Sequence, residues 1–185
     1  TDRNAGGPAA AGGMNFQAAV TSLVMVKLLG GDKLNWLHGI ATDVPVGVSS
    51  ETGGAGDDIH LELIGGQRVE VQVKKGLRSG ESLQSSLIEL AKGVAHSDID
   101  FGVLAVSSTS SATVREKLAR NIVRRGEGRL DGHCKNAQLF FEGLNHAGYD
   151  AKEICQCIRI VTLHFEVGDS ASLDTGLICL ERVTK

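Results

Sequence analysis

The chain has 185 residues, of which 42% are hydrophobic and 22% charged, close to a soluble folded protein and unlike a collagen-like or wholly disordered chain. The 19 Lys and Arg are outnumbered by 22 Asp and Glu, and this net charge of −3 argues against a strongly basic, tail-driven nucleic-acid binder. No apolar stretch approaches the roughly 18 residues of a membrane span and no secretory signal is recognisable, so we expect a cytoplasmic protein without membrane association.

The first part of the chain predicts a leader followed by a helix. Residues 1–13 are rich in Gly and Ala and predict a flexible leader, with one domain over residues 14–185. A helix is expected from Met14, because apolar residues then recur at helical spacing, and Gly30-Gly31 is expected to end it. Residues 34–50 have room for a short strand.

Alternation of apolar and polar residues predicts a β-hairpin over residues 58–74. Its register decides which side chains share a face. A two-residue turn at Gly65-Gly66 would place the polar residues of the two strands on opposite faces. A three-residue loop, Gly65-Gly66-Gln67, would pair Asp58 with Lys74 on one face, and we expect this loop because three-residue hairpin loops that contain Gly are common.

Strands alternate with helices in the rest of the chain, which predicts an α/β class: a central mixed β-sheet flanked by helices. The hairpin makes the sheet mixed rather than wholly parallel. The further elements are expected in this order: a helix from Glu81 to about Ala95, a buried strand over 101–106, a helix capped by Ser110-Ser111 and ending near Arg125, a helix over 136–147, a short helix from Asp150, and strands near 159–167 and 176–183.

Three polar side chains are expected to converge at one end of the hairpin. Asp58 supplies a carboxylate and Gln72 a neutral amide oxygen, which are ligands that Mg²⁺ prefers, and the backbone carbonyl of Val73 is a further candidate ligand. Lys74 could orient an attacking water and stabilise negative charge on a phosphate. These residues together predict metal-dependent hydrolysis of a phosphodiester.

Asp57-Asp58-Ile59 followed by Gln72-Val73-Lys74 resembles the core of the PD-(D/E)XK phosphodiesterases, in the Gln-x-Lys variant of Mrr-like restriction enzymes. The resemblance implies a restriction-endonuclease-like core. It also implies that Asp58, Gln72 and Lys74 are catalytic. Three further residues are secondary candidates: Gln17 on the preceding helix, Asp57, which stands where the family has proline, and Glu51 as an additional metal ligand.

The order of motifs, from Gly12-Gly13-Met14-Asn15-Phe16-Gln17 to Asp100-Phe101, is similar to the N-terminal endonuclease domains of bacterial antiphage effectors. Such nucleases are fused to cyclic-oligonucleotide sensors, as in CBASS, or to STAND-type NTPases. The resemblance implies Mg²⁺ as cofactor, with Mn²⁺ able to replace it, and double-stranded DNA as substrate. It further implies a fused sensor or NTPase domain in a longer protein and a homo-oligomer in the active state.

Basic residues cluster after the expected central strand. Between Val114 and Lys135 there are seven Lys and Arg but only three acids. They predict contacts with DNA phosphates, although a solvated helix face or a contact with another domain would show the same pattern. The candidates for phosphate contacts are Lys75, Arg78, Arg115, Arg120 and Arg124.

Two alternatives remain open. The domain could bind DNA or a partner without cleaving, or it could serve chiefly as an oligomerisation module. The four cysteines are too dispersed for a disulfide scaffold, and Cys155-Gln-Cys157 lacks the spacing of a zinc ribbon, so reduced and mostly buried thiols are expected.

Overall fold

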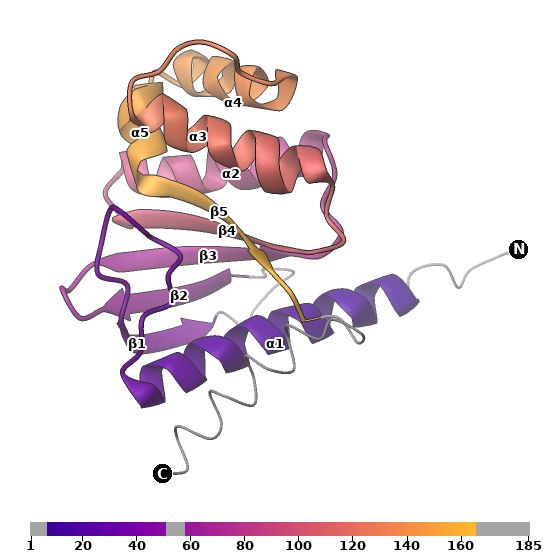
Figure 1. The fold of residues 1–185 in the computed structure, drawn as a ribbon, viewed down its shortest axis with the longest axis vertical. Helices are drawn as coiled ribbons and strands as arrows, with labels where there is room; N and C mark the ends of the chain where they lie inside the picture. The colour runs from indigo at the N-terminus through magenta and orange to yellow at the C-terminus, as the bar shows by residue number, and fades with distance from the viewer. Residues whose placement is uncertain (1–6, 51–57, 166–185) are drawn as a thin grey trace, which may run out of the picture.

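The computed structural model describes residues 7–50 and 58–165, with side chains over 16–49 and 59–165. The described chain forms a five-stranded sheet with the strands in the order β1-β2-β3-β4-β5 (Figure 1). The strands are β1 (Pro45–Ser50), β2 (Asp58–Leu63), β3 (Arg68–Lys74), β4 (Phe101–Ser107) and β5 (Ile158–Leu163). The helices are α1 (Gly7–Gly30), α2 (Glu81–Ala95), η1 (Thr113–Leu118), α3 (Ala119–Gly126), α4 (Lys135–His146) and α5 (Ala151–Cys157).

The sheet is mixed. β1, β2 and β3 pair antiparallel, whereas β3, β4 and β5 pair parallel. The parallel pairs need crossover connections, which α2 provides between β3 and β4, and η1, α3, α4 and α5 provide between β4 and β5. The expected α/β class with a mixed sheet flanked by helices is therefore confirmed, and it is consistent with a restriction-endonuclease-like core.

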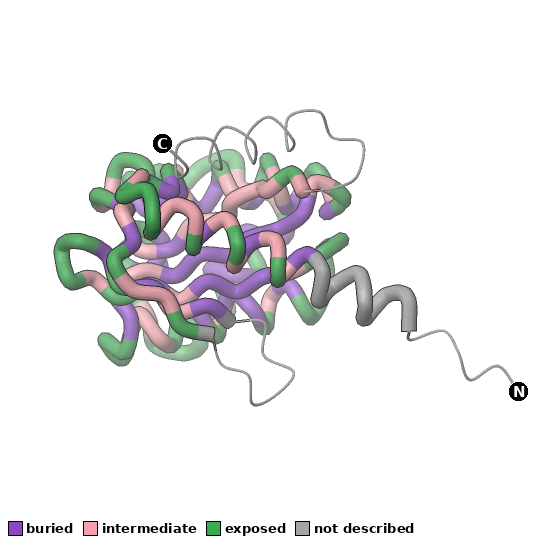
Figure 2. Tube along the Cα trace, turned by 90° about the horizontal axis from the view of Figure 1, so that it is seen from below, coloured by how far each residue is buried: buried purple, intermediate pink, exposed green. Residues whose placement is uncertain are grey.

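Helices cover both faces of the sheet, α1 on one side and α2 to α5 on the other (Figure 1). The residues of β3 alternate between these faces. Val71 and Val73 belong to the core cluster that contains Phe16 and Val20 of α1. Buried residues follow the central strands, and exposed residues lie mainly on loops and the outer sides of helices (Figure 2). The positions between the valines, including Gln72, face the α2 side.

The β2–β3 turn has the expected length but lies one residue earlier than expected. The loop is Ile64-Gly65-Gly66, since the Leu63 N–H donates to the Gln67 carbonyl across 2.9 Å. Gly66 has φ 77°, the left-handed conformation that the last residue of such a loop requires. The predicted pairing of Asp58 with Lys74 is consequently wrong, because Asp58 pairs with Gln72. A shift of two residues keeps the parity, so positions 58, 72 and 74 still share a face.

Two helix starts differ from the sequence-based prediction. The helix expected from Met14 already begins at Gly7. The predicted Ser110-Ser111 cap is wrong, because no side chain caps η1, and the Ser110 hydroxyl instead accepts a hydrogen bond from the Leu77 N–H.

Other predicted elements agree with the structure. The helix 81–95 and the strand beginning at Phe101 match, and the Asp150 carboxylate caps α5 by accepting from the Lys152 and Glu153 N–H groups. The strand expected near 176–183 lies outside the described residues.

Candidate functional site

The candidate site lies where β2 begins and β3 ends. Within the described residues, the β2–β3 ladder stops at the Asp58–Gln72 pair, and β3 continues for two more residues to Lys74. Because side chains alternate along a strand, positions 58, 72 and 74 lie on the same face of the sheet, at the end where β2 begins and β3 stops. The backbone thus brings the three principal candidates of the sequence together.

Gln72 is the buried polar residue of this edge. Only 3% of its surface is exposed, and it lies on β3, the central strand of the sheet. Its Nε2 donates a hydrogen bond to Oε2 of Glu89 on α2, across 3.2 Å. Its Oε1 is buried and has no hydrogen-bond partner among the described residues. A buried acceptor without a partner is costly, so an atom or ion that binds Oε1 would relieve that cost.

Lys74 and Val73 end β3 next to this amide. Lys74 is half-buried, and its backbone pairs with Val106 of β4. The Val73 side chain is buried in the core that faces α1, so only the Val73 carbonyl is available as the expected ligand. Both residues lie beyond the last described β2–β3 pair.

The secondary candidates are less clearly placed. Gln17 is half-buried in α1, which covers the face that carries Val71 and Val73 rather than the face of Gln72. Glu51 and Asp57 lie outside the described residues, and all three remain predictions.

The donor set fits a divalent cation in one respect. The Gln72 Oε1 is a hard oxygen atom on the face of position 58, without a hydrogen-bond partner among the described residues. Within residues 16–49 and 59–165, no three His, Cys, Asp or Glu side chains come together as a metal site. The carboxylates predicted for such a site, Glu51, Asp57 and Asp58, have side chains outside these ranges.

Sequence reasoning missed Glu89. It lies fifteen residues after Lys74, on a helix whose apolar residues carry the visible periodic signal. Its position in α2 places it on the Gln72 side chain, which only the packing of α2 on the sheet reveals.

The loop Lys75–Arg78 follows β3 and is tied to the loop after β4. The Gly76 N–H donates to Oγ of Ser107 across 2.9 Å, and the Leu77 N–H donates to Oγ of Ser110 across 2.8 Å. These two bonds hold the exposed Lys75 and Arg78 side chains at the sheet edge where β3 ends.

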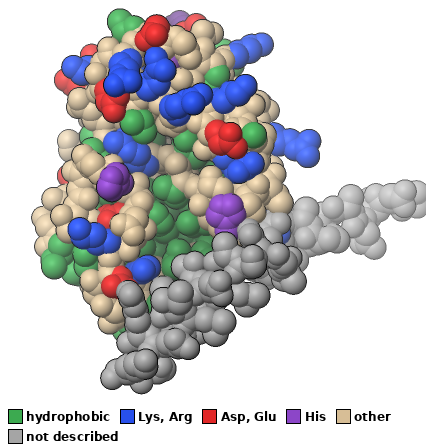
Figure 3. Space-filling model, in the orientation of Figure 1, with side chains coloured by type: hydrophobic (Ala, Val, Ile, Leu, Met, Phe, Trp, Pro, Cys, Tyr) green, Lys and Arg blue, Asp and Glu red, His purple; other side chains and the backbone are tan. Residues whose placement is uncertain are grey.

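The other basic candidates lie on η1 and α3, which follow the loop after β4. Arg115 donates to the Ser110 carbonyl across 2.8 Å, which keeps it next to the Lys75–Arg78 loop. Arg120 is exposed farther along, whereas Arg124 pairs with Asp131 at 3.1 Å. Lys and Arg side chains gather over the helical layer in the upper part of Figure 3. Lys75, Arg78 and Arg115 are therefore the basic candidates nearest to the end of β3.

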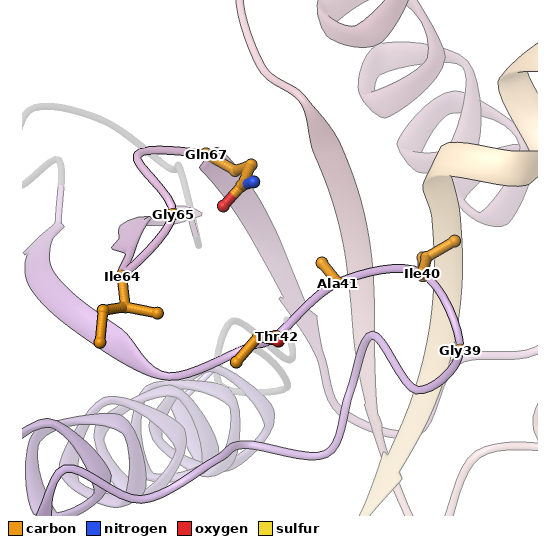
Figure 4. Close-up of a pocket in the computed structure, with 7 residues that line it drawn as sticks. All are labelled: Gly39, Ile40, Ala41, Thr42, Ile64, Gly65 and Gln67. Carbon is orange, nitrogen blue, oxygen red and sulfur yellow. The ribbon is translucent and has the colours of Figure 1, made fainter.

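Two pockets lie away from this edge. One, of about 650 Å³, lies between residues 39–42 and the β2–β3 turn, and no charged side chain lines it (Figure 4). A second, of about 310 Å³, is lined by polar residues that include His60, Glu62, Arg68 and Asp98. Neither contains the orphaned amide oxygen of Gln72.

In the described part of the chain, no helix is both long and apolar enough to cross a membrane.

Comparison with known proteins gives weak structural likenesses only. No family model matches the chain, and no curated protein matches it. A solved structure of the Moraxella osloensis Cap4 SAVED/CARF-domain containing receptor is similar at TM-score 0.48 and 16% identity, covering 93% of this chain and 37% of that one. The corresponding Acinetobacter baumannii receptor gives TM-score 0.46 and 11% identity, over 93% and 36%. The chain thus spans little more than a third of those proteins, and its own residues carry the functional proposals.

Proposed function

We propose that this domain is a metal-dependent endonuclease that hydrolyses phosphodiester bonds of double-stranded DNA. The observation that carries the proposal is the buried Oε1 of Gln72, which has no partner among the described residues and lies two residues before Lys74, opposite position 58. A buried amide oxygen without a hydrogen bond lowers the stability of the fold, but it is a suitable ligand for Mg²⁺.

Each residue has a distinct role in this proposal. Asp58 and Gln72 would hold the cation, with the Val73 carbonyl as a further ligand. When bound, Mg²⁺ supplies electrophilic assistance at the scissile phosphate, and Mn²⁺ would replace it because both accept oxygen ligands. The Lys74 ammonium would orient the attacking water and stabilise the negative charge that develops on the phosphate oxygens.

The basic residues near the end of β3 support a duplex substrate. Lys75, Arg78 and Arg115 gather near the end of β3, where they can contact phosphates on either side of the cleaved bond. The chain has only five Phe, one Tyr and one Trp, so stacking on unpaired bases is poorly served. Recognition of the duplex backbone is therefore favoured over recognition of single strands.

The biological setting belongs to the same proposal. We propose a cytoplasmic effector of an antiphage defence system, fused to a sensor or NTPase domain and active as a homo-oligomer. The net charge of −3 supports the need for self-association, because a single acidic domain attracts DNA weakly. A monomer that cleaves DNA at the full rate would contradict this part.

Plasmid digestion tests the proposal. The full-length protein should cleave in Mg²⁺ and stop in EDTA, and Lys74→Ala should slow cleavage by at least about 100-fold. Lys92→Ala is the matched control, because Lys92 is an exposed lysine on α2. Cleavage by Lys74→Ala at the wild-type rate would exclude the proposed role. Retained DNA binding without any cleavage would favour a silent DNA-binding module.

A further inference from the structure

We propose that Glu89 is a positioning residue that fixes the orientation of the Gln72 amide and thereby presents Oε1, rather than the NH₂ group, to the cation. The inference rests on the proposed metal site and adds a residue to it. It is carried by one contact and one absence: the hydrogen bond from Nε2 to Glu89, and the buried Oε1 without a partner among the described residues.

A glutamine amide can turn either end toward a neighbour, and the neighbour decides which. An ionised carboxylate only accepts hydrogen bonds, so Glu89 selects the NH₂ end of Gln72. The carbonyl oxygen then points away from Glu89. In the reversed orientation two acceptors would face each other, and the site would present N–H groups that repel a cation.

Burial makes this selection necessary. Only 3% of the Gln72 surface is exposed, so solvent contributes little to the choice between the two amide orientations. Glu89 itself is exposed to solvent. Its neighbour Leu90 is fully buried in the core, so α2 holds the Glu89 backbone in a fixed place beside the sheet.

Metal binding to the full-length protein tests this role independently of cleavage. Calorimetric titration with Mn²⁺ alone should show binding to the wild type and a loss of affinity of about 10- to 100-fold in Glu89→Ala, as for other residues that orient a ligand. The exposed Glu142 on α4 supplies the control, and Glu142→Ala should bind Mn²⁺ like the wild type. The thermal unfolding temperature in EDTA should be unchanged in Glu142→Ala and slightly lower in Glu89→Ala, because the Gln72 Nε2 loses its acceptor there.

The outcomes separate the two proposals. Wild-type affinity in Glu89→Ala overturns the positioning role and leaves the metal site standing. Absence of Mn²⁺ binding by the wild type overturns both.

Discussion

Gly76 and Ser107 are joined by a hydrogen bond of 2.9 Å, from the backbone N–H of one to the hydroxyl of the other. Ser107 is fully buried and ends β4, while Gly76 lies two residues after the end of β3 and has φ 64°. Through this bond the end of the parallel strand pair holds the loop that carries Lys75 and Arg78. The positions of Lys75 and Arg78 thus depend on a buried serine that lies 31 residues after Gly76 in the sequence.

Ser107→Ala should destabilise the protein by about 1 kcal/mol, because the Gly76 N–H and the Thr109 hydroxyl each lose a hydrogen bond at a part-buried site. Urea unfolding measures this change. Ser108→Ala is the control, since the adjacent Ser108 is only half-buried and should be nearly neutral. Equal effects in the two variants would show that the Ser107 hydroxyl has no special role.

Arg78→Ala should weaken DNA binding uniformly across sequences and lower the salt slope of the binding constant by about 1, as expected for one lost phosphate contact. Fluorescence anisotropy with a labelled duplex over a range of salt concentrations measures both. Arg129→Ala is the comparison, because Arg129 is exposed but pairs with Glu127 at 3.3 Å. An unchanged slope in Arg78→Ala would remove this loop from the proposed interface.

Gly126→Ala should destabilise the protein by about 1–3 kcal/mol. A Cβ at position 126 would lie 2.9 Å from the Cys155 carbonyl oxygen, and backbone atoms of α5 cannot move aside cheaply. At Gly143 the same methyl would meet the Ile88 Cδ1 at 3.2 Å, which is the flexible end of a side chain. Gly143→Ala should therefore be close to neutral. Thermal unfolding of both variants tests whether α3 and α5 are in such close contact.

Burial raises the pKa of the Cys155 thiol to about 12, from about 9 in the unfolded chain. Above pH 9 the unfolded chain therefore loses a proton that the folded chain keeps. The stabilising contribution is complete below that pH and is lost as the pH rises toward 12. Unfolding free energies on both sides of pH 9 should fall less steeply in Cys155→Ala than in the wild type. Parallel curves would mean that this thiol does not titrate differently in the two states.

The sequence by itself determined the local elements and their faces. Period-two alternation assigned Val71 and Val73 to one side and Gln72 to the other, and helical periodicity located α2 at residues 81–95. Both signals depend on residues close together in the chain. They identified Asp58, Gln72 and Lys74 as one candidate set because strand parity survives a shift of two residues.

The register and the partners of these residues were decided only by tertiary structure. Gly66 adopts the αL conformation at the end of the loop Ile64-Gly65-Gly66, one residue earlier than the predicted loop. Gln72 rather than Lys74 therefore lies opposite Asp58. The Glu89 contact and the Ser107 bond to Gly76 join residues on separate elements, which come together only when α2 and β4 pack beside β3. Local periodicity says which way a side chain faces, but the neighbour it meets depends on how distant elements bury their apolar surfaces against each other.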